Sequence, residues 1–169
     1  FGEYLPLSWL TAPIAALLQI PASHQLPGAP EQPLLRFAGS LIQPFICYEI
    51  AYPGIGLGGL DPDWMVVLSD DAWYGTSWAL DQHLKMTQFR AQEWGRDIVF
   101  VNNNGRSSWI NHQGEIQAAL PAFESGVLTV TPHRRSGHPW IVRYPWTPYG
   151  LMLLFGIISV SRRFWRLCE

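Results

Sequence analysis

The sequence is short of charged side chains and of cysteine. Only 14% of its residues are charged and 48% are hydrophobic, whereas ordinary soluble proteins carry roughly 25% charged residues. This deficit indicates a membrane segment, a large buried interface, or both. A scaffold held by disulfides needs more than the two cysteines present, Cys47 and Cys168, and neither has a neighbour at the spacing of metal ligands.

Basic residues are also too few and too scattered for binding to nucleic acid. The net charge is −2, and arginines cluster only at the extreme C-terminus. We predict neither a cofactor nor a metal site, because the histidines show no ligand spacing; they are His24, His83, His112, His133 and His138. The sequence begins at Phe1 without an initiator methionine or a signal-peptide pattern, so we expect a piece of a longer protein.

Three apolar runs bounded by turn residues predict buried strands, over residues 41–47, 64–69 and 97–101. Between the second and third runs, residues 77–95 have the spacing of an amphipathic helix. The order strand, helix, strand predicts a crossover between parallel strands, and continuous apolar runs predict strands covered on both faces. The fold class expected is therefore α/β.

Further along the chain the pattern changes from parallel strands to a hairpin. Residues 107–110 and 115–117 alternate around a turn at 111–114, and Leu128–Val130 predicts a last strand. In the predicted helix, Glu93 and Arg96 are spaced to form an ion pair across one turn. Residues 1–138 together predict one α/β domain.

The C-terminal segment differs in kind. No charged residue occurs from Trp146 to Val160, and arginines follow. This run is shorter than the ~20 residues that usually span a bilayer, but aromatic residues before it and arginines after it are typical of membrane flanks. We predict a transmembrane helix with its flanks over residues 139–163 and a cytoplasmic tail over 164–169. A buried helix at the end of a soluble domain is the alternative.

Cys47 is the candidate nucleophile, because it ends the first predicted strand and enters a turn. A strand fixes the position of such a thiol while the turn exposes its sulfur; the alternative is a buried cysteine that acts as a small apolar residue. Polar residues also follow the other two strands, in Asp70-Asp71 and Asn103-Asn104-Gly105. Parallel strands end at one edge of a sheet, so the three groups are expected to converge there, although turns commonly contain such residues.

These motifs resemble those of the apolipoprotein N-acyltransferases, a membrane branch of the carbon–nitrogen hydrolase (nitrilase) superfamily. The resemblance runs from Phe1 to about Val160. In order, the motifs are Phe1-Gly2-Glu3, Ile46-Cys47-Tyr48-Glu49, Ser69-Asp70-Asp71-Ala72-Trp73-Tyr74-Gly75, Arg90-Ala91-x-Glu93, Asn103-Asn104-Gly105 and Gln113-Gly114-Glu115-Ile116. The cysteine motif and the Asp-Ala-Trp motif are the specific ones.

The resemblance implies a nitrilase-like αββα sandwich, present here in part, on the periplasmic face of the bacterial inner membrane. It implies a Glu–Lys–Cys triad in which Cys47 becomes a thioester. The acyl donor would be a phospholipid, and the acceptor the N-terminal amine of a diacylglyceryl-cysteine apolipoprotein. Glu3, Tyr48, Glu49 and Trp73 match residues that shape the family's site.

Three departures from the family leave other interpretations open. The family's triad glutamate and lysine precede the Phe-Gly-Glu motif, so they lie outside these residues and the chain alone is expected to be inactive. Asp70 stands where the family usually has asparagine, and its charge would disfavour a thiolate nearby. Arg106 stands where the family has a small or aliphatic residue. An amidase or nitrilase-type hydrolase and a non-catalytic membrane relative are the alternatives.

Overall fold

The computed structural model describes residues 13, 17, 32–52 and 60–165, with side chains described up to residue 159. Glu3 therefore lies outside the described residues, together with the rest of its motif. The chain divides into two compact units, residues 1–137 and 138–169, each with its own internal contacts. The functional assignments made for the segments 1–138, 139–163 and 164–169 stay predictions.

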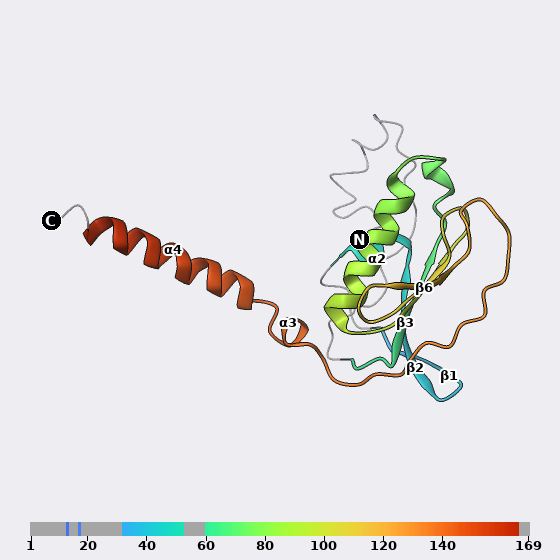
Figure 1. The fold of residues 1–169 in the computed structure, drawn as a ribbon, viewed down its shortest axis with the longest axis horizontal. Coiled ribbons are helices and arrows are strands. Elements are labelled where there is room, and N and C mark those ends of the chain that lie inside the picture. The colour runs from blue at the N-terminus through green and yellow to red at the C-terminus, as the bar shows by residue number, and fades with distance from the viewer. Residues whose placement is uncertain (1–12, 14–16, 18–31, 53–59, 166–169) are drawn as a thin grey trace. The chain divides into compact units, whose positions relative to one another are not determined.

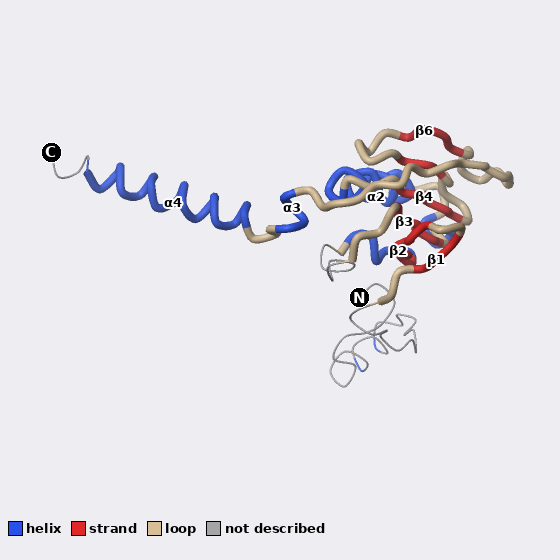
Figure 2. The backbone as a smooth tube through the Cα atoms, turned by 90° about the horizontal axis from the view of Figure 1, so that it is seen from below, coloured by secondary structure: helices blue, strands red, loops and turns tan. Residues whose placement is uncertain are grey.

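The first unit is built on a six-stranded mixed sheet whose strands lie in chain order (Figures 1 and 2). β2, β3 and β4 run parallel at the centre, β1 pairs antiparallel with β2, and β5 and β6 continue antiparallel beyond β4. The bounds are β1 Leu35–Phe37, β2 Ser40–Ile46, β3 Trp64–Ser69, β4 Ile98–Asn102, β5 Ser108–Ile110 and β6 Ile116–Ala119. The predicted α/β class, with its parallel centre and terminal hairpin, is confirmed.

The three central strands end in register at one edge of the sheet. Ile46 pairs with Leu68, and Ser69 pairs with Asn102, so the chain leaves all three strands side by side. β2 ends one residue earlier than predicted because Cys47 has a φ of +51° and opens the 3₁₀ helix η1 (Cys47–Ala51). The parallel arrangement thus brings the loops after β2, β3 and β4 together.

Helix α2 (Ala79–Trp94) covers one face of the sheet, as Figure 1 shows. Leu84, Ala91 and Trp94 are buried on its inner side, as their spacing predicts. The helix ends at Gly95, whose φ of +62° is a left-handed conformation that glycine adopts readily and that lets its N–H reach the last-turn carbonyls. The predicted helix is confirmed.

One face of the sheet is only partly covered by the described residues, and the predicted pairing of Glu93 with Arg96 is wrong. On the face away from α2, Leu68 and Val101 are 46% and 43% exposed, so the described residues do not cover both faces. Glu93 pairs with Arg90 one turn earlier, and Arg96 pairs with Asp61. Arg96 follows Gly95, just after the end of α2. Its buried guanidinium donates hydrogen bonds to the carbonyls of Pro62 and Gly137.

The predicted last strand at Leu128–Val130 is also wrong, because residues 120–137 contain no strand. Main-chain donors of this segment bond to separate partners instead of to successive residues of one strand. The N–H of His133 donates to the Asp97 carboxylate at 3.0 Å, and that of Arg135 to the Asp63 carbonyl at 3.2 Å. An alternating apolar pattern makes a strand only where a neighbouring strand offers its free edge.

The second unit contains two helices, α3 (Trp140–Arg143) and α4 (Thr147–Trp165). The described side chains of α4 are largely exposed and mostly apolar; the exposed large apolar ones are Tyr149, Leu151, Met152, Leu153, Leu154, Phe155, Ile157 and Ile158. Over the part of the chain that the structure describes, no helix combines the length and hydropathy needed to cross a bilayer. The predicted span over residues 139–163 is therefore not confirmed.

Asp97, buried at the start of β4, ties the hairpin and the following segment to the sheet. Its carboxylate accepts hydrogen bonds from the Trp109 indole at 3.1 Å and from the main-chain N–H groups of His112 and His133, each at 3.0 Å. Burial raises the pKa of Asp97, but hydrogen bonds from His133, Trp109 and His112 outweigh it and lower the pKa below its ordinary value. The carboxylate is thus held ionised.

This arrangement predicts acid-sensitive stability. Because the folded-state pKa of Asp97 is depressed, its stabilising contribution is complete above the ordinary pKa of 3.8 and is lost as the pH falls through the folded-state value. We expect Asp97→Asn to lower the free energy of unfolding at neutral pH and to flatten its decline in acid. Denaturant unfolding over a pH series measures both, with exposed Asp81→Asn as the control. An unaltered acid profile in D97N would contradict the assignment.

Candidate active site

Cys47 sits at the turn between β2 and η1, in a backbone conformation that its own side chain disfavours. A φ of +51° is uncommon for residues other than glycine, so neighbouring contacts must hold it. One is the Glu49 carboxylate, which accepts a hydrogen bond from the Ile46 N–H at 2.7 Å and closes the turn around Cys47. The thiol is half-buried. Glu49 therefore supports the cysteine turn, as its position two residues after Cys47 suggests.

Asp71 is the buried centre of the polar groups behind this turn. Its carboxylate, with no exposure to solvent, accepts from the Ser69 hydroxyl at 2.7 Å, from Nδ1 of His83 at 3.0 Å and from the Asn102 amide. Burial raises the pKa of Asp71, but the bonds from His83, Ser69 and Asn102 outweigh it and lower the pKa below its ordinary value. Donors from β3, α2 and β4 thus meet at one carboxylate.

Two of these donor residues also contact Cys47. The Ser69 Oγ lies 3.5 Å from the Cys47 Sγ, and Nε2 of His83 lies 3.2 Å from the Cys47 carbonyl oxygen. The loops after β2, β3 and β4 therefore converge through bonded contacts. This confirms the expected meeting of strand ends, with Ser69, Asp71 and Asn102 as the residues that join them.

The Asn-Gly sequence after β4 has a steric reason. The Asn102 Oδ1 accepts from the Gly105 N–H at 2.8 Å, while the Asn102 amide group donates to Asp71. A Cβ on Gly105 would lie 2.7 Å from the Asn102 Nδ2, closer than atoms can approach. Glycine at 105 therefore allows the loop to fold over Asn102. Asn102 is buried, whereas Asn103, named in the sequence motif, is exposed.

The remaining predicted residues take different places. The Tyr48 ring packs 5.3 Å from the His83 imidazole, behind the cysteine turn. Trp73, in the short 3₁₀ helix η2 (Ala72–Tyr74), is 82% exposed. Asp70 is exposed, and its carboxylate accepts from the Ala72 N–H at 3.0 Å and from the Asn103 amide at 3.3 Å, so it serves its own turn. Arg106 is exposed.

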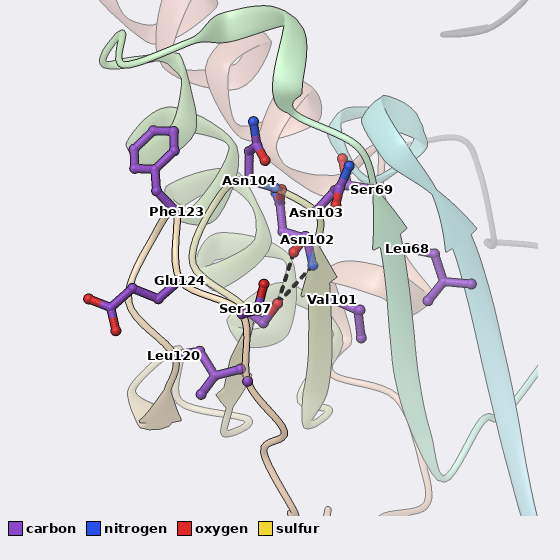
Figure 3. A pocket seen from close by; sticks show the side chains of 12 residues that line it. Leu68, Ser69, Val101, Asn102, Asn103, Asn104, Ser107, Leu120, Phe123 and Glu124 are labelled. Carbon is purple, nitrogen blue, oxygen red and sulfur yellow. Dashed lines mark hydrogen bonds between the residues drawn. The ribbon is translucent and has the colours of Figure 1, made fainter.

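A pocket of about 620 Å³ lies at the ends of β3 and β4 (Figure 3). Ser69 lines it and also contacts Cys47, which is not itself a lining residue. Asn103 and Asn104 bring amide groups to one end, whereas Leu68, Val101, Leu120 and Phe123 supply apolar walls. Glu124 and the serines add further polar groups, so the lining mixes polar and apolar side chains.

The role of His83 and the burial of Asp71 were not predicted from the sequence. His83, Thr87 and Arg90 are polar, yet they recur at helical spacing on the buried side of α2. A buried polar residue needs a partner, so polar residues on the core side of a predicted helix were the available signal. Among the described residues no cluster of three or more His, Cys, Asp or Glu side chains is arranged to hold a metal ion.

The fit of Gly105 against Asn102 yields a stability prediction. We expect Gly105→Ala to lower the free energy of unfolding by about 1–3 kcal/mol, because the added methyl must displace the Asn102 amide from Asp71. Gly126→Ala is the control, since its Cβ would meet only the end of the Leu120 side chain. Denaturant unfolding compares the two. Equal effects of both substitutions would show that the Asn102 contact is not the constraint.

Comparison with known proteins agrees with this geometry. Residues 21–141 match the family model described as carbon-nitrogen hydrolase. The apolipoprotein N-acyltransferase of Shewanella oneidensis is 39% identical over 96% of this chain and 32% of its own length. The enzyme of Azotobacter vinelandii is 38% identical over 96% of this chain and 32% of its own length. The enzyme of Pseudomonas syringae pv. tomato is 41% identical over 76% of this chain and 26% of its own length. The chain thus spans about a third of the length of these relatives.

Among solved structures, an amidase from Nesterenkonia sp. aligns with 59% of this chain and 41% of its own, at a TM-score of 0.46 and 19% identity. The family assignment does not depend on that alignment. It follows from the match to the family model, which covers all of the sheet, the cysteine turn and helix α2. The chain belongs to the carbon–nitrogen hydrolase family, and its curated relatives include apolipoprotein N-acyltransferases.

Proposed function

We propose that this chain forms the cysteine-bearing part of an apolipoprotein N-acyltransferase. The intact enzyme would move a fatty acyl chain from a phospholipid to the N-terminal amine of a diacylglyceryl-cysteine apolipoprotein, through a thioester on Cys47. The observation that carries the proposal is the Cys47 turn, held at the sheet edge beside a pocket, in a chain whose relatives bear that name.

The chemistry follows from the position of the thiol. The Cys47 thiolate attacks the ester carbonyl of the phospholipid, the alkoxide of the lysophospholipid leaves and takes up a proton, and an acyl thioester remains. The amine of the acceptor then attacks the thioester, the thiolate leaves, and the nitrogen loses a proton as the amide forms. Two substrates thus use one nucleophile in turn.

Two groups needed for this reaction would come from outside these residues: the general base and the cation that stabilises the oxyanion. A general base typically contributes 10²–10⁴-fold in rate, and one oxyanion donor about 10²–10³-fold. The described chain would supply the nucleophile and the groups that hold it. We therefore expect the 169 residues alone to form thioester no faster than background.

We propose further that α4 inserts into a bilayer and that the Cys47 site lies on the periplasmic side. Support comes from the exposed apolar side chains along α4, such as Leu153 and Phe155, and from its lack of acidic residues. Tyr144, Trp146 and Tyr149 are exposed near its start, where amphipathic rings suit the headgroup region. The arginines after Val160 would then remain on the cytoplasmic side.

Acyl transfer through Cys47 predicts a trapped thioester. With the intact protein and a phospholipid carrying a labelled acyl chain, we expect label that neutral hydroxylamine releases. Cys47→Ala should abolish it, because no other described group replaces the sulfur, whereas Cys168→Ala should retain it and serves as the matched control. Label in C47A equal to that of the parent would refute the nucleophile, and its absence from the parent would favour a non-catalytic relative.

Insertion of α4 predicts vesicle binding by a synthetic peptide of residues 138–169. Asp costs about 3 kcal/mol more than an apolar residue at the centre of a membrane helix, so Phe155→Asp should weaken partitioning about 100-fold. Thr147→Asp adds the same charge at the first residue of α4 and should change it little. Tryptophan fluorescence against vesicle concentration gives the partition coefficients. Equal losses in both variants would argue against insertion of the helix centre.

A further inference from the structure

His83 bridges the buried Asp71 carboxylate and the backbone of Cys47, and the acyl-transfer steps described above give it no role. The side chain has no exposure to solvent. Its Nδ1 lies 3.0 Å from both oxygens of Asp71, and its Nε2 lies 3.2 Å from the Cys47 carbonyl oxygen. Each ring nitrogen therefore faces an oxygen that accepts hydrogen bonds.

Two donors on one imidazole require a proton on each nitrogen. A neutral ring carries only one N–H, so one nitrogen lone pair would point at an oxygen lone pair. At Nδ1 that oxygen belongs to Asp71, which the bonds from Ser69 and Asn102 also keep ionised. At Nε2 it belongs to a backbone carbonyl, which cannot donate. The geometry is satisfied when both nitrogens are protonated.

The surroundings match a cation held by one carboxylate. The Tyr48 ring from η1 and the Phe100 ring from β4 pack against the imidazole, at centroid distances of 5.3 and 5.1 Å. On α2 itself, the Thr87 hydroxyl donates to the His83 carbonyl at 3.0 Å. Of the charged groups in the described chain, Asp71 is the one bonded to the ring. The aromatic walls keep water from replacing either hydrogen bond.

We propose that His83 is a positioning residue for Cys47: a doubly protonated imidazole, fixed by Asp71, that holds the Cys47 carbonyl and so keeps the cysteine in its strained turn. The Glu49 carboxylate accepts from the N–H of Ile46, the residue before Cys47, and His83 holds the carbonyl of Cys47 itself. With both sides bonded, the φ of +51° is maintained and the sulfur keeps one direction. The inference rests on the proposed role of Cys47 as nucleophile.

Two substitutions of His83 each keep one of its two hydrogen bonds and remove the other. In His83→Gln the side-chain amide can reach the place of Nε2 and donate to the Cys47 carbonyl. In His83→Asn the shorter amide can reach only the place of Nδ1 and the Asp71 carboxylate. The control is Thr87→Val, which removes a hydroxyl from the same buried side of α2 and leaves the imidazole intact.

The measurement is the alkylation rate of Cys47 by iodoacetamide in the intact protein, with the modified peptide quantified by mass spectrometry. We expect H83N to slow alkylation about tenfold, as loss of one buried hydrogen bond would, whereas H83Q and T87V stay within about twofold of the parent. A purely structural role would make H83Q and H83N equally slow. Equal rates for the two, or an H83N rate at least as fast as the parent's, would overturn the proposal.

A second measurement is made on the unsubstituted protein and does not depend on H83N, in case that variant does not fold; H83Q serves only to identify the His83 signals. In intact protein labelled with ¹⁵N-histidine, the His83 signals, identified by their loss in H83Q, should show a proton on both ring nitrogens at neutral pH. A single protonated nitrogen would overturn the proposal. Neither experiment uses phospholipid or apolipoprotein, so a failure of thioester formation alone would count against the proposed function and not against the bridge.

Discussion

A carboxylate that water cannot reach must receive its hydrogen bonds from the protein, and this requirement at Asp71 organises the site. Ser69, His83 and Asn102 provide those bonds from the end of β3, from α2 and from the end of β4. Loss of any one donor would leave a buried charge partly unsatisfied, which is costly. The three elements are therefore fixed relative to one another at the point where Cys47 lies.

The conformation of Cys47 depends on the residues that Asp71 holds in place. Its positive φ is unfavourable for a residue with a side chain, so the conformation depends on contacts from outside the turn. Glu49 accepts from the N–H of Ile46, His83 bonds the Cys47 carbonyl, and Ser69 lies beside the sulfur. The nucleophile that we propose is thus held by groups that are themselves held by Asp71, which is how a rigid scaffold presents a reactive side chain.

The same physical device recurs at Asp97, where it anchors loops instead of a reactive group. A buried carboxylate accepts from the Trp109 indole and from the backbone of His112 and His133, and it joins the β5–β6 hairpin to the segment after residue 130. One face of the sheet packs under α2, and the other face stays partly exposed at Leu68 and Val101. The pocket that Ser69 lines lies at the ends of β3 and β4.

The parallel strands, the α2 helix, the hairpin and the position of Cys47 at a strand end could be predicted from the sequence, because periodicity and turn residues act locally. The sequence also carried the family resemblance. Three features depend on how the chain packs and could not be predicted: Asp71 and not Asp70 is buried, His83 reaches Cys47, and Leu128–Val130 forms no strand. Adjacent aspartates are equivalent in a local pattern, and a hydrogen bond between residues 36 positions apart exists only once the sheet and helix have packed.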